Sequence, residues 1–349
     1  MKAAIRTLAL IILLLAAIGG GGVWYIWNGM QPVKPAGPPV TFTIEKGMGS
    51  AKIADLLEQN GIIRKGLFFR GYLKWVKEGS SFKAGTYTAS PGDTYDSLIA
   101  RLNAGDVVKK DTVSFTIPEG YTAKQVANKL AAAWNQKPEV FLKIIDSGAG
   151  LEAVGRLGIP ENSKLRHRLE GYLFPETYEL VKESTPEQVV EAMLEQLEKK
   201  LDSIKGWQGK LKNRGLSLHE LLTVASLVER EVVVDSERPI VAGVIYNRLD
   251  KGQKLEIDAT VQYLLDKQKQ RLYEKDLKVN SPYNTYKNEG LPPGPISSPG
   301  LASIEAALTP EASDYYFYVT KKDGSQGHLF GRTYKEHLAN IKKSEQNSQ

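Results

Sequence analysis

The chain has 349 residues, a length that allows two or three domains with hydrophobic cores. Hydrophobic residues make up 42% and charged residues 25%, as in ordinary globular proteins, which excludes a wholly disordered chain. The net charge is only +6, and no dense Lys/Arg run with interleaved aromatic residues occurs, which argues against a nucleic-acid partner. The absence of cysteine excludes disulfides, thiolate metal sites, a cysteine nucleophile and a lipid anchor on cysteine.

The N-terminus carries a signal for export. Lys2 and Arg6 precede an uncharged apolar run from Leu8 to Trp27, about 20 residues, which is long enough to span a bilayer as a helix. The two cations predict that residues 1–7 stay in the cytoplasm and that the rest of the chain lies on the other side of the membrane. A cleaved signal peptide is the alternative, because Leu8 to Ile18 has the length of a signal-peptide apolar core. Both interpretations export the folded part of the protein.

A repeated pattern follows this segment. Residues 28–39 are rich in proline and predict a short, stiff linker. Between residues 40 and 135, a strand–turn–helix pattern occurs at 40–61, more faintly at 85–102, and again at 113–130. We interpret residues 40–135 as small α+β modules.

The remainder of the chain is predicted to be rich in helices. Residues 136–342 are interpreted as one domain and residues 343–349 as a polar tail. Capping boxes and apolar periodicity predict helices that begin after Thr185, after Ser217 and at Pro239. The predicted fold class is therefore α+β, with an N-terminal transmembrane helix, α+β modules and a mixed, helix-rich domain.

The helix that begins after Ser217 carries two glutamates near its end. A period of 3.6 residues predicts that its buried stripe consists of Leu221, Val224, Ala225, Val228 and Val232. Glu229 lies at the margin of this stripe, whereas Glu231 is expected to face water. A carboxylate at an apolar margin is desolvated, which favours its protonated form and suits a general acid. The alternative is a surface glutamate that pairs with a basic neighbour.

Three further segments are candidates for a binding site. LEGYLFPETY at 169–178 alternates aromatic rings with carboxylates, as in a sugar-binding loop, although a packed structural loop is the alternative. NRL at 247–249 and EIDAT at 256–260 supply polar side chains, and SPYNTY at 281–286 leads into a Pro-rich loop that ends at Gly300. The histidines show no metal-ligand spacing, and the chain has no phosphate-binding loop or nucleophile elbow. No cofactor and no metal are therefore expected.

Four motifs occur in one order along the chain: LEGYLFPETY, ASLVERE at 225–231, YNTY followed by GLPPGPISSPG, and GHLF at 327–330. Together they resemble the YceG-like family of endolytic murein transglycosylases. The resemblance extends from the apolar N-terminal run to about residue 342. It implies that the modules at 40–135 are LysM-like and that 136–342 is the catalytic domain.

The resemblance implies a lyase that cleaves the β-1,4 bond between N-acetylmuramic acid and N-acetylglucosamine inside nascent glycan strands, leaving a 1,6-anhydro end. Glu229 matches the catalytic glutamate of the family and would be the general acid. The residues expected to line the substrate cleft are Glu170, Tyr172, Asn247, Asp258, Tyr283, Asn284, Thr285 and Tyr286. The implied partners are peptidoglycan strands and, because strand termination accompanies synthesis, membrane glycan polymerases such as penicillin-binding proteins.

Two other functions stay open on the sequence. A peptidoglycan hydrolase would use Glu229 with Glu170 or Asp258, since glycoside hydrolases ordinarily need two carboxylates, and it would leave a reducing end. A non-catalytic scaffold would bind glycan through the LysM-like modules.

Overall fold

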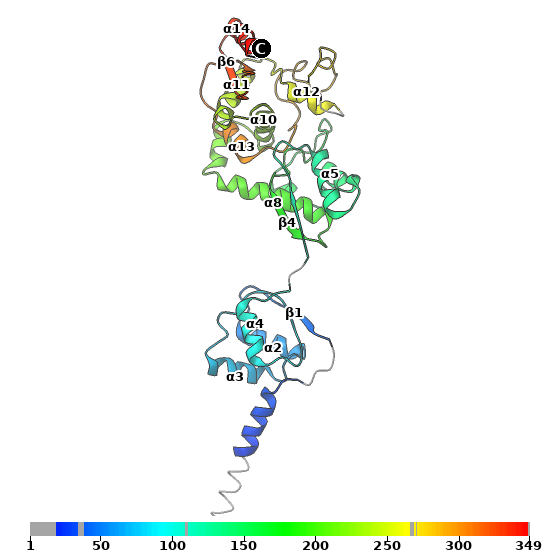
Figure 1. The fold of residues 1–349 in the computed structure, drawn as a ribbon, viewed down its shortest axis with the longest axis vertical. Coiled ribbons are helices and arrows are strands. Elements are labelled where there is room, and N and C mark those ends of the chain that lie inside the picture. Colours follow the sequence, from blue (N-terminus) through cyan, green and yellow to red (C-terminus); the bar gives the residue numbers. More distant parts are fainter. Residues whose placement is uncertain (1–18, 34–37, 109–110, 266–268, 270, 348–349) are drawn as a thin grey trace, which may run out of the picture. The chain divides into compact units, whose positions relative to one another are not determined.

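The structure, a computed structural model, describes residues 19–33, 38–108, 111–265, 269 and 271–347. The chain divides into two compact units, Met1–Lys110 and Asp111–Gln349 (Figure 1). Both units combine helices with small antiparallel sheets, which confirms the predicted α+β class.

The first unit is built around one pair of strands. Its elements are β1 (Val40–Ile44), α2 (Ser50–Gln59), α3 (Gly66–Val76), β2 (Gly85–Ala89) and α4 (Tyr95–Ala104). Strand β1 pairs antiparallel with β2, and the rings of the facing residues Phe42 and Tyr87 stack with their centroids 5.9 Å apart. Because side chains alternate along a strand, β1 buries Phe42 and Ile44 against the helices. The strand and helix predicted at 40–61 are confirmed.

Residues 19–30 form a helix ahead of this sheet. Residues 28–30, which the sequence assigned to the linker, belong to that helix. Within the described part of the chain, no helix has both the length and the apolar character needed to cross a membrane. The predicted transmembrane segment at 8–27 begins outside the described residues, which start at residue 19.

The second unit holds most of the helices. Its helical elements are α5 (Ala123–Trp134), α6 (Pro138–Ser147), α7 (Glu152–Arg156), α8 (Pro186–Ser203), α9 (Trp207–Asn213), α10 (Leu218–Glu231), η1 (Asp235–Glu237), α11 (Arg238–Asp250), α12 (Asp258–Leu264), α13 (Leu301–Leu308) and α14 (Tyr334–Gln346). Its strands form two antiparallel pairs, β3 (Thr112–Thr116) with β4 (Thr177–Val181) and β5 (Phe317–Thr320) with β6 (His328–Gly331). The helices predicted after Thr185 and Ser217 are confirmed, and both capping boxes are formed.

The boundary between the units lies after residue 110, whereas the repeated pattern in the sequence predicts modules that end at residue 135. The difference comes from a long-range strand pairing. Strand β3 pairs with β4, with Phe115 opposite Tyr178 and their rings stacked 5.2 Å apart. The last strand–turn–helix segment of the repeated pattern therefore contributes to the core of the second unit.

The C-terminal segment also differs from the predicted polar tail at 343–349. Helix α14 continues to Gln346. The Ser344 hydroxyl donates to the Thr320 carbonyl at 2.7 Å, and the Asn347 amide donates to the Lys321 carbonyl at 2.7 Å. The polar composition of this segment therefore reflects an exposed helix that is tied to the end of β5.

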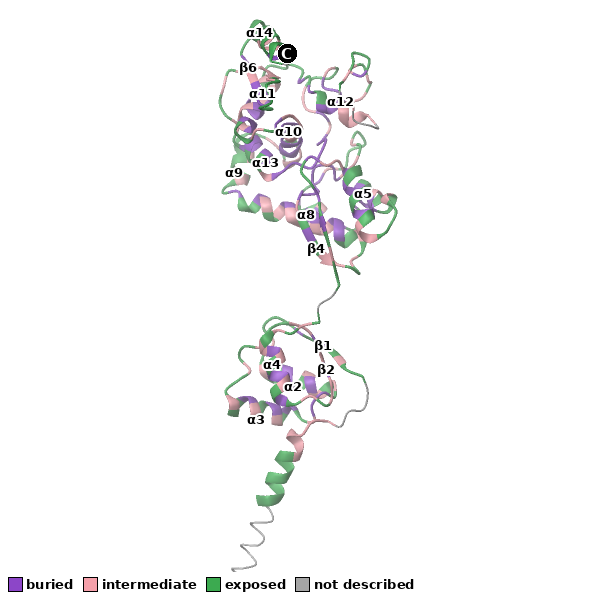
Figure 2. Ribbon diagram, viewed as in Figure 1, coloured by how far each residue is buried: buried purple, intermediate pink, exposed green. Residues whose placement is uncertain are grey.

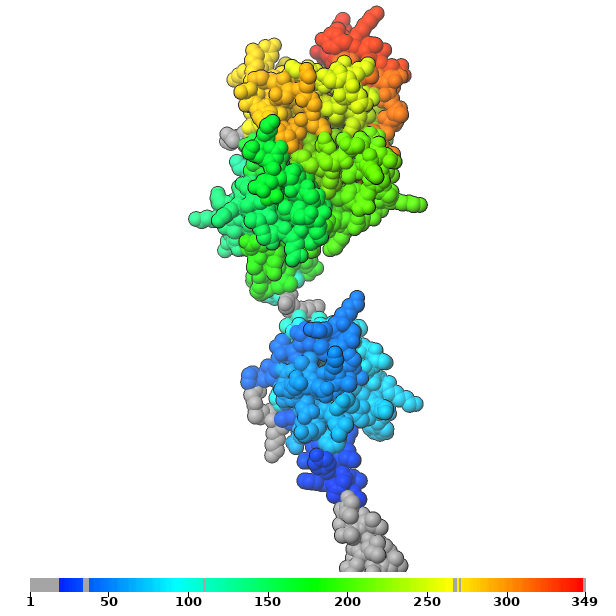
Figure 3. All heavy atoms as spheres, turned by 180° about the vertical axis from the view of Figure 1, so that it is seen from behind, coloured from blue at the N-terminus to red at the C-terminus, as the bar shows by residue number. Residues whose placement is uncertain are grey.

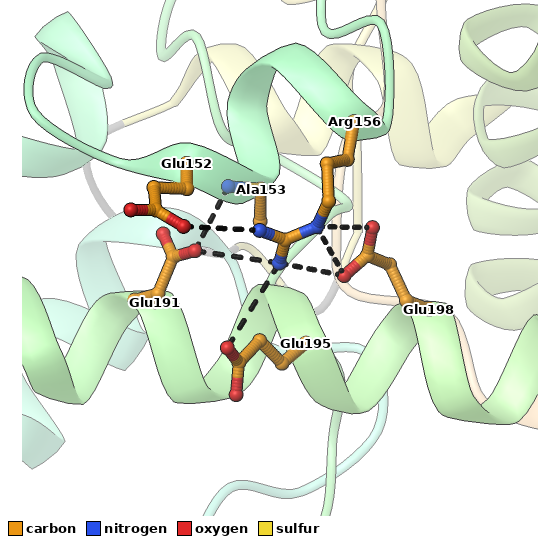
Figure 4. A network of polar contacts seen from close by, with 6 residues as sticks. All are labelled: Glu152, Ala153, Arg156, Glu191, Glu195 and Glu198. Carbon is orange, nitrogen blue, oxygen red and sulfur yellow. Dashed lines mark hydrogen bonds and ion pairs between the residues drawn. The ribbon is translucent and has the colours of Figure 1, made fainter.

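A branched ion network ties the short helix α7 to α8 (Figure 4). The Arg156 Nε donates to both carboxylate oxygens of Glu198, at 3.0 and 3.1 Å. Glu191 Oε1 lies 3.5 Å from Arg156 Nη2 and accepts the backbone N–H of Ala153 at 2.8 Å. Because the Arg156 side chain is 42% exposed, this network fixes the position of α7 more than it stabilises the fold.

The Pro-rich segment packs against the LEGYLF segment. In Figure 3, yellow and orange atoms of the later part of the second unit lie beside green atoms of its earlier part. At Gly171, with φ +81°, an added Cβ would lie 2.3 Å from the Pro295 Cβ. This glycine is therefore required both by its left-handed backbone and by the close approach of the proline.

We expect Gly171→Ala to lower the free energy of unfolding by more than Gly158→Ala does. Both glycines have positive φ, 81° and 59°, so each substitution incurs a left-handed strain of roughly 1–2 kcal/mol. Only at Gly171 would the new Cβ also clash, because nothing lies within 4 Å at Gly158. Urea unfolding of the two variants measures the difference, and equal losses would contradict the close packing against Pro295.

Candidate active site

Helix α10 forms the centre of the second unit (Figure 2). The Ser217 hydroxyl accepts the Glu220 N–H, and the Glu220 carboxylate accepts the Ser217 N–H, which fixes the start of the helix. Every residue from Leu221 to Val228 is buried. The predicted stripe is therefore confirmed as buried, but the other sides of this part of the helix are buried as well. Glu229 and Glu231 follow this buried stretch and point to different sides of the helix, since successive residues are about 100° apart.

Glu229 lies in an enclosed polar cluster. Its Oε2 accepts the Gly300 N–H at 3.0 Å and the Ser303 hydroxyl at 2.8 Å. The Arg238 guanidinium lies 3.5 Å away, and only 7% of the Glu229 side chain and 10% of the Arg238 side chain are exposed. Asp235 pairs with the other side of this guanidinium at 3.1 Å. Glu229 therefore connects the end of α10 to the starts of α11 and α13.

Glu119 lies beside this cluster, in the turn after β3. A Cβ built on Gly300 would lie 1.9 Å from Glu119 Oε1, so this carboxylate contacts the same backbone that Glu229 binds. Burial raises the pKa of Glu119, the charge of Glu229 raises it further, and Arg238 opposes the shift. The sequence places Glu119 in the turn of the strand–turn–helix pattern at 113–130, and nothing in the local sequence shows that α13 begins beside it.

Glu231 faces a cavity of about 580 Å³. The cavity is lined by Arg230, Glu231, Arg248, Leu255, Glu256, Asp258, Tyr286, Tyr318, Val319, Thr320, His328 and His337. The Tyr318 hydroxyl donates to Glu231 Oε2 at 3.1 Å. The expectation that Glu231 faces open water was wrong, because α12 and β5 cover this side of α10.

The environment of Glu231 favours its protonated form. Burial raises the pKa of Glu231 to about 7, and the charge of Asp258 raises it in the same direction. Hydrogen bonds from Tyr318 and from the Ala259 backbone oppose the shift. A carboxyl group with a pKa near the working pH is suited to donate a proton and to take one back.

Tyr286 of the YNTY motif lines the same cavity as Glu231. The Tyr286 hydroxyl donates to Asp258 Oδ1 at 2.5 Å. Thr285 Oγ1 accepts the Ile257 N–H at 3.0 Å and lies 3.0 Å from the Thr260 hydroxyl. Thr285 therefore positions the start of α12, and with it the carboxylate of Asp258.

Three further motif residues line the cavity. Arg248 donates to the Leu255 carbonyl at 2.7 Å and lies 3.7 Å from the Glu256 carboxylate. Glu256 has φ +52°, an uncommon conformation for a residue with a side chain, and such strain is frequent at functional sites. His328 of the GHLF motif is buried, with its Nδ1 2.7 Å from Glu237 Oε2. The cavity thus presents groups of both charge signs on a rigid frame.

The other predicted cleft residues lie away from this cavity. The Tyr172 hydroxyl lies 2.9 Å from His219 Nδ1, and Asn247 donates to the carbonyls of Ser313 and Tyr315. Asn284 donates to two backbone carbonyls in the loop that precedes it. Glu170, Tyr172, Tyr283, Asn284 and Thr285 are all at most 2% exposed. Of the eight residues predicted to bind substrate, the structure brings only Asp258 and Tyr286 to the lining of the cavity.

Glu170 is a second carboxylate with a strongly shifted pKa. Its Oε1 accepts the Ala123 N–H at 2.8 Å, and its Oε2 accepts the Tyr263 hydroxyl at 3.0 Å. Burial raises the pKa of Glu170 to about 8, although both hydrogen bonds oppose the shift. Glu170 therefore joins the start of α5 to α12 inside the core.

A model of the YceG-like family matches residues 42–343 of the chain. The chain belongs to the YceG-like family. The endolytic murein transglycosylase of Bacillus subtilis is 35% identical over 327 residues, which cover 91% of this family member and 88% of the relative. An endolytic murein transglycosylase of Streptococcus pneumoniae is 32% identical over 95% of this chain, which spans only 63% of that relative's length.

One solved structure of a YceG-like protein is also similar. A crystal structure of such a protein from Listeria monocytogenes has 34% sequence identity and a TM-score of 0.59, covering 86% of this chain and 98% of that one. The similarity includes both units, because 86% of the chain exceeds the length of either.

We expect the stability of the protein to fall as the pH rises from about 4.5 to about 8, partly because of Glu170. The pKa of Glu170 is 4.5 in the unfolded chain and about 8 in the folded state. At a pH between these two values, Glu170 keeps its proton in the folded state and loses it in the unfolded chain, so the folded state loses its advantage as the pH rises. Glu170→Gln should reduce this loss, and urea unfolding between pH 5 and 9 measures it. Glu161→Gln, at a side chain that is 87% exposed, is the matched control and should leave the pH dependence unchanged. An identical slope for Glu170→Gln and wild type would contradict the assignment.

Proposed function

We propose that this chain is an endolytic murein transglycosylase whose reaction takes place in the cavity that Glu231 faces. Relatives that carry this name are 32–35% identical over more than nine-tenths of the chain. The observation that carries the site is one cavity-facing carboxyl group with a pKa of about 7, in a cavity that Asp258 and Tyr286 also line.

In the proposed reaction, protonated Glu231 donates its proton to the oxygen that joins N-acetylmuramic acid to N-acetylglucosamine. The bond from C1 of the muramic residue to this oxygen breaks, and the C6 hydroxyl of the same residue forms a new bond to C1. Ionised Glu231 then takes the proton of that hydroxyl, so the enzyme is restored and no water is consumed. Because the nucleophile belongs to the substrate, its effective concentration is high and a second catalytic carboxylate is unnecessary.

The surroundings of Glu231 support this role. Positive charge develops at C1 in the transition state of glycosidic cleavage, and the carboxylates of Asp258 and Glu256 line the same cavity. Tyr286 holds Asp258 by a hydrogen bond. We propose that Asp258 stabilises this charge and also keeps Glu231 protonated, while Tyr286 positions Asp258.

The sequence assigned the acid to Glu229, and that assignment stays a prediction. We favour Glu231 because Oε2 of Glu229 already accepts two hydrogen bonds and lies 3.5 Å from a guanidinium. This oxygen of Glu229 is therefore held by the protein. We propose that Glu229 instead holds α10, α11 and α13 together.

We further propose that the enzyme is held at the outer face of the bacterial cytoplasmic membrane by the apolar run at 8–27, with residues 1–7 inside. Lys2 and Arg6 ahead of that run support this orientation. The first unit, which we interpret as LysM-like, would bind glycan strands close to the membrane. This position favours newly made strands as the substrate and glycan polymerases as neighbours.

We expect Glu231→Gln to reduce the formation of 1,6-anhydro ends by ~10²–10⁴-fold, the usual contribution of general acid–base catalysis. Glu229→Gln, two residues away on the same helix, is the matched control. It should lower the thermal unfolding temperature, because it weakens a buried ion pair, while the folded fraction keeps its activity. Mass analysis of products from isolated murein strands measures both variants.

The reverse result would restore the assignment of Glu229: an active Glu231→Gln enzyme beside an inactive, normally stable Glu229→Gln enzyme. Products heavier by one water, with reducing ends, would instead identify a hydrolase. Glycan binding without any cleavage by the wild-type protein would favour a scaffold.

Asp258→Asn should shift the alkaline limb of the pH–rate profile to lower pH. The charge of Asp258 contributes to the raised pKa of Glu231, so its removal lowers that pKa and the acid loses its proton sooner as the pH rises. Asp235→Asn is the control, because Asp235 is exposed and pairs with Arg238 in the Glu229 cluster. An unshifted limb in kcat/KM for Asp258→Asn would contradict the coupling between the two carboxylates.

A further inference from the structure

Helix α3 of the first unit presents an apolar and basic face to solvent. Leu67 is 67% exposed and Trp75 is 76% exposed, two of the most exposed large apolar side chains among the described residues. They lie eight positions apart, which separates them by about 80° around the helix axis, so both belong to the same broad face. Arg70 and Lys74 are exposed on the same helix, and α3 contains no acidic residue.

The opposite face of α3 fixes this helix in the unit. Phe69 and Leu73 are buried in its core, and the Phe69 ring packs edge-on against Tyr95 at 5.0 Å. The exposed face therefore cannot turn inward without unfolding the core. Its apolar side chains stay in contact with solvent unless another surface covers them.

The C-terminal end of the helix at 19–30 packs against α3 within the same unit (Figure 1). The rings of Tyr25 and Phe68 meet edge-on at 5.6 Å. A Cβ added to Gly29 would lie 2.1 Å from the Phe68 ring, so this ring packs directly against the backbone at Gly29. The Tyr95 hydroxyl donates to the Gly29 carbonyl at 3.4 Å.

The helix at 19–30 is itself exposed and apolar. Its exposed large side chains are Val23, Trp24, Tyr25, Ile26 and Trp27, each at least 49% exposed. The uncharged sequence from Leu8 to Ile18 continues this apolar character toward the N-terminus. Trp and Tyr at the end of an apolar run are typical of a helix that leaves a bilayer at the level of the lipid headgroups.

We propose that α3 lies in the headgroup region of the membrane as a second, lateral contact beside the N-terminal helix. This inference rests on the proposed membrane attachment and adds to it a defined surface of the first unit. The contact between Phe68 and Tyr25 places α3 at the depth of the interfacial aromatic residues. Trp75 and Leu67 then enter the acyl boundary, and Lys74 meets anionic headgroups.

The composition of α3 fits a bilayer better than a protein partner. Helices that lie in the membrane interface combine Trp, Phe and Leu on one face with Lys and Arg on the other. Of the cations at α3, Arg70 lies 3.8 Å from Asp55, and no acidic partner of Lys74 is found among the described residues. The consequence is that the first unit is held in one orientation on the membrane by two contacts.

The test uses the natural absence of cysteine, which lets one label report one position. Leu67→Cys, Trp75→Cys, Trp24→Cys and Val108→Cys variants of the full chain are each labelled with an environment-sensitive NBD fluorophore. They are reconstituted into phosphatidylcholine–phosphatidylglycerol vesicles that contain lipid quenchers near the headgroup. Val108 is the matched control, because it is 44% exposed and belongs to the same unit but not to α3.

We expect quenching at positions 24, 67 and 75 and little at 108, with murein cleavage retained as evidence of folding. Quenching at 24 without quenching at 67 and 75 would overturn the lateral contact and leave the membrane attachment intact. No quenching at any position would overturn both proposals. Equal quenching at all four positions, 108 included, would also overturn the assignment of α3, because the contact would then lack a defined face.

Discussion

The burial of helix α10 is the constraint on which the second unit depends. Because every residue from Leu221 to Val228 is buried, polar groups at the end of this helix need partners or an opening to solvent. Glu229 finds partners, since two donors and the Arg238 guanidinium surround its Oε2. Glu231 finds an opening, with Tyr318 as its hydrogen-bonding neighbour. One helix end thus provides both a rigid joint and a carboxyl group that faces a cavity.

The motif residues around α10 serve mainly to hold backbone in place. Ser226 accepts the Ile296 N–H at 3.1 Å, which fixes the Pro-rich segment along the helix. His219 bridges the Tyr172 hydroxyl and the Pro293 carbonyl, at 2.9 and 2.8 Å. Thr285 fixes the start of α12 by accepting the Ile257 N–H. These contacts explain why aromatic and polar side chains that resemble sugar ligands in the sequence lie inside the fold, where they keep the cavity walls rigid.

Local patterns in the sequence predicted local structure well. The capping boxes at Thr185 and Ser217 and the alternation at 40–44 depend on neighbouring residues, and the structure has each of them. The partner of β3 could not be predicted in this way, because Thr112 pairs with Val181 across a long stretch of chain. Helical periodicity separates Glu229 from Glu231 by about 200° but does not show which side is covered. That depends on α12, α13 and β5, which come later in the chain.

A raised pKa does not by itself identify a catalytic acid, as the two shifted glutamates of this unit demonstrate. Burial raises the pKa of Glu170 to about 8 and that of Glu231 to about 7. Glu170 is 2% exposed and both of its oxygens accept hydrogen bonds from the protein, so no substrate oxygen can reach it. Glu231 combines its shift with access to a cavity and with a nearby carboxylate on a rigid helix start. Proton transfer to a glycosidic oxygen needs access and geometry together with the shifted pKa, and in this unit Glu231 meets these requirements whereas Glu170 does not.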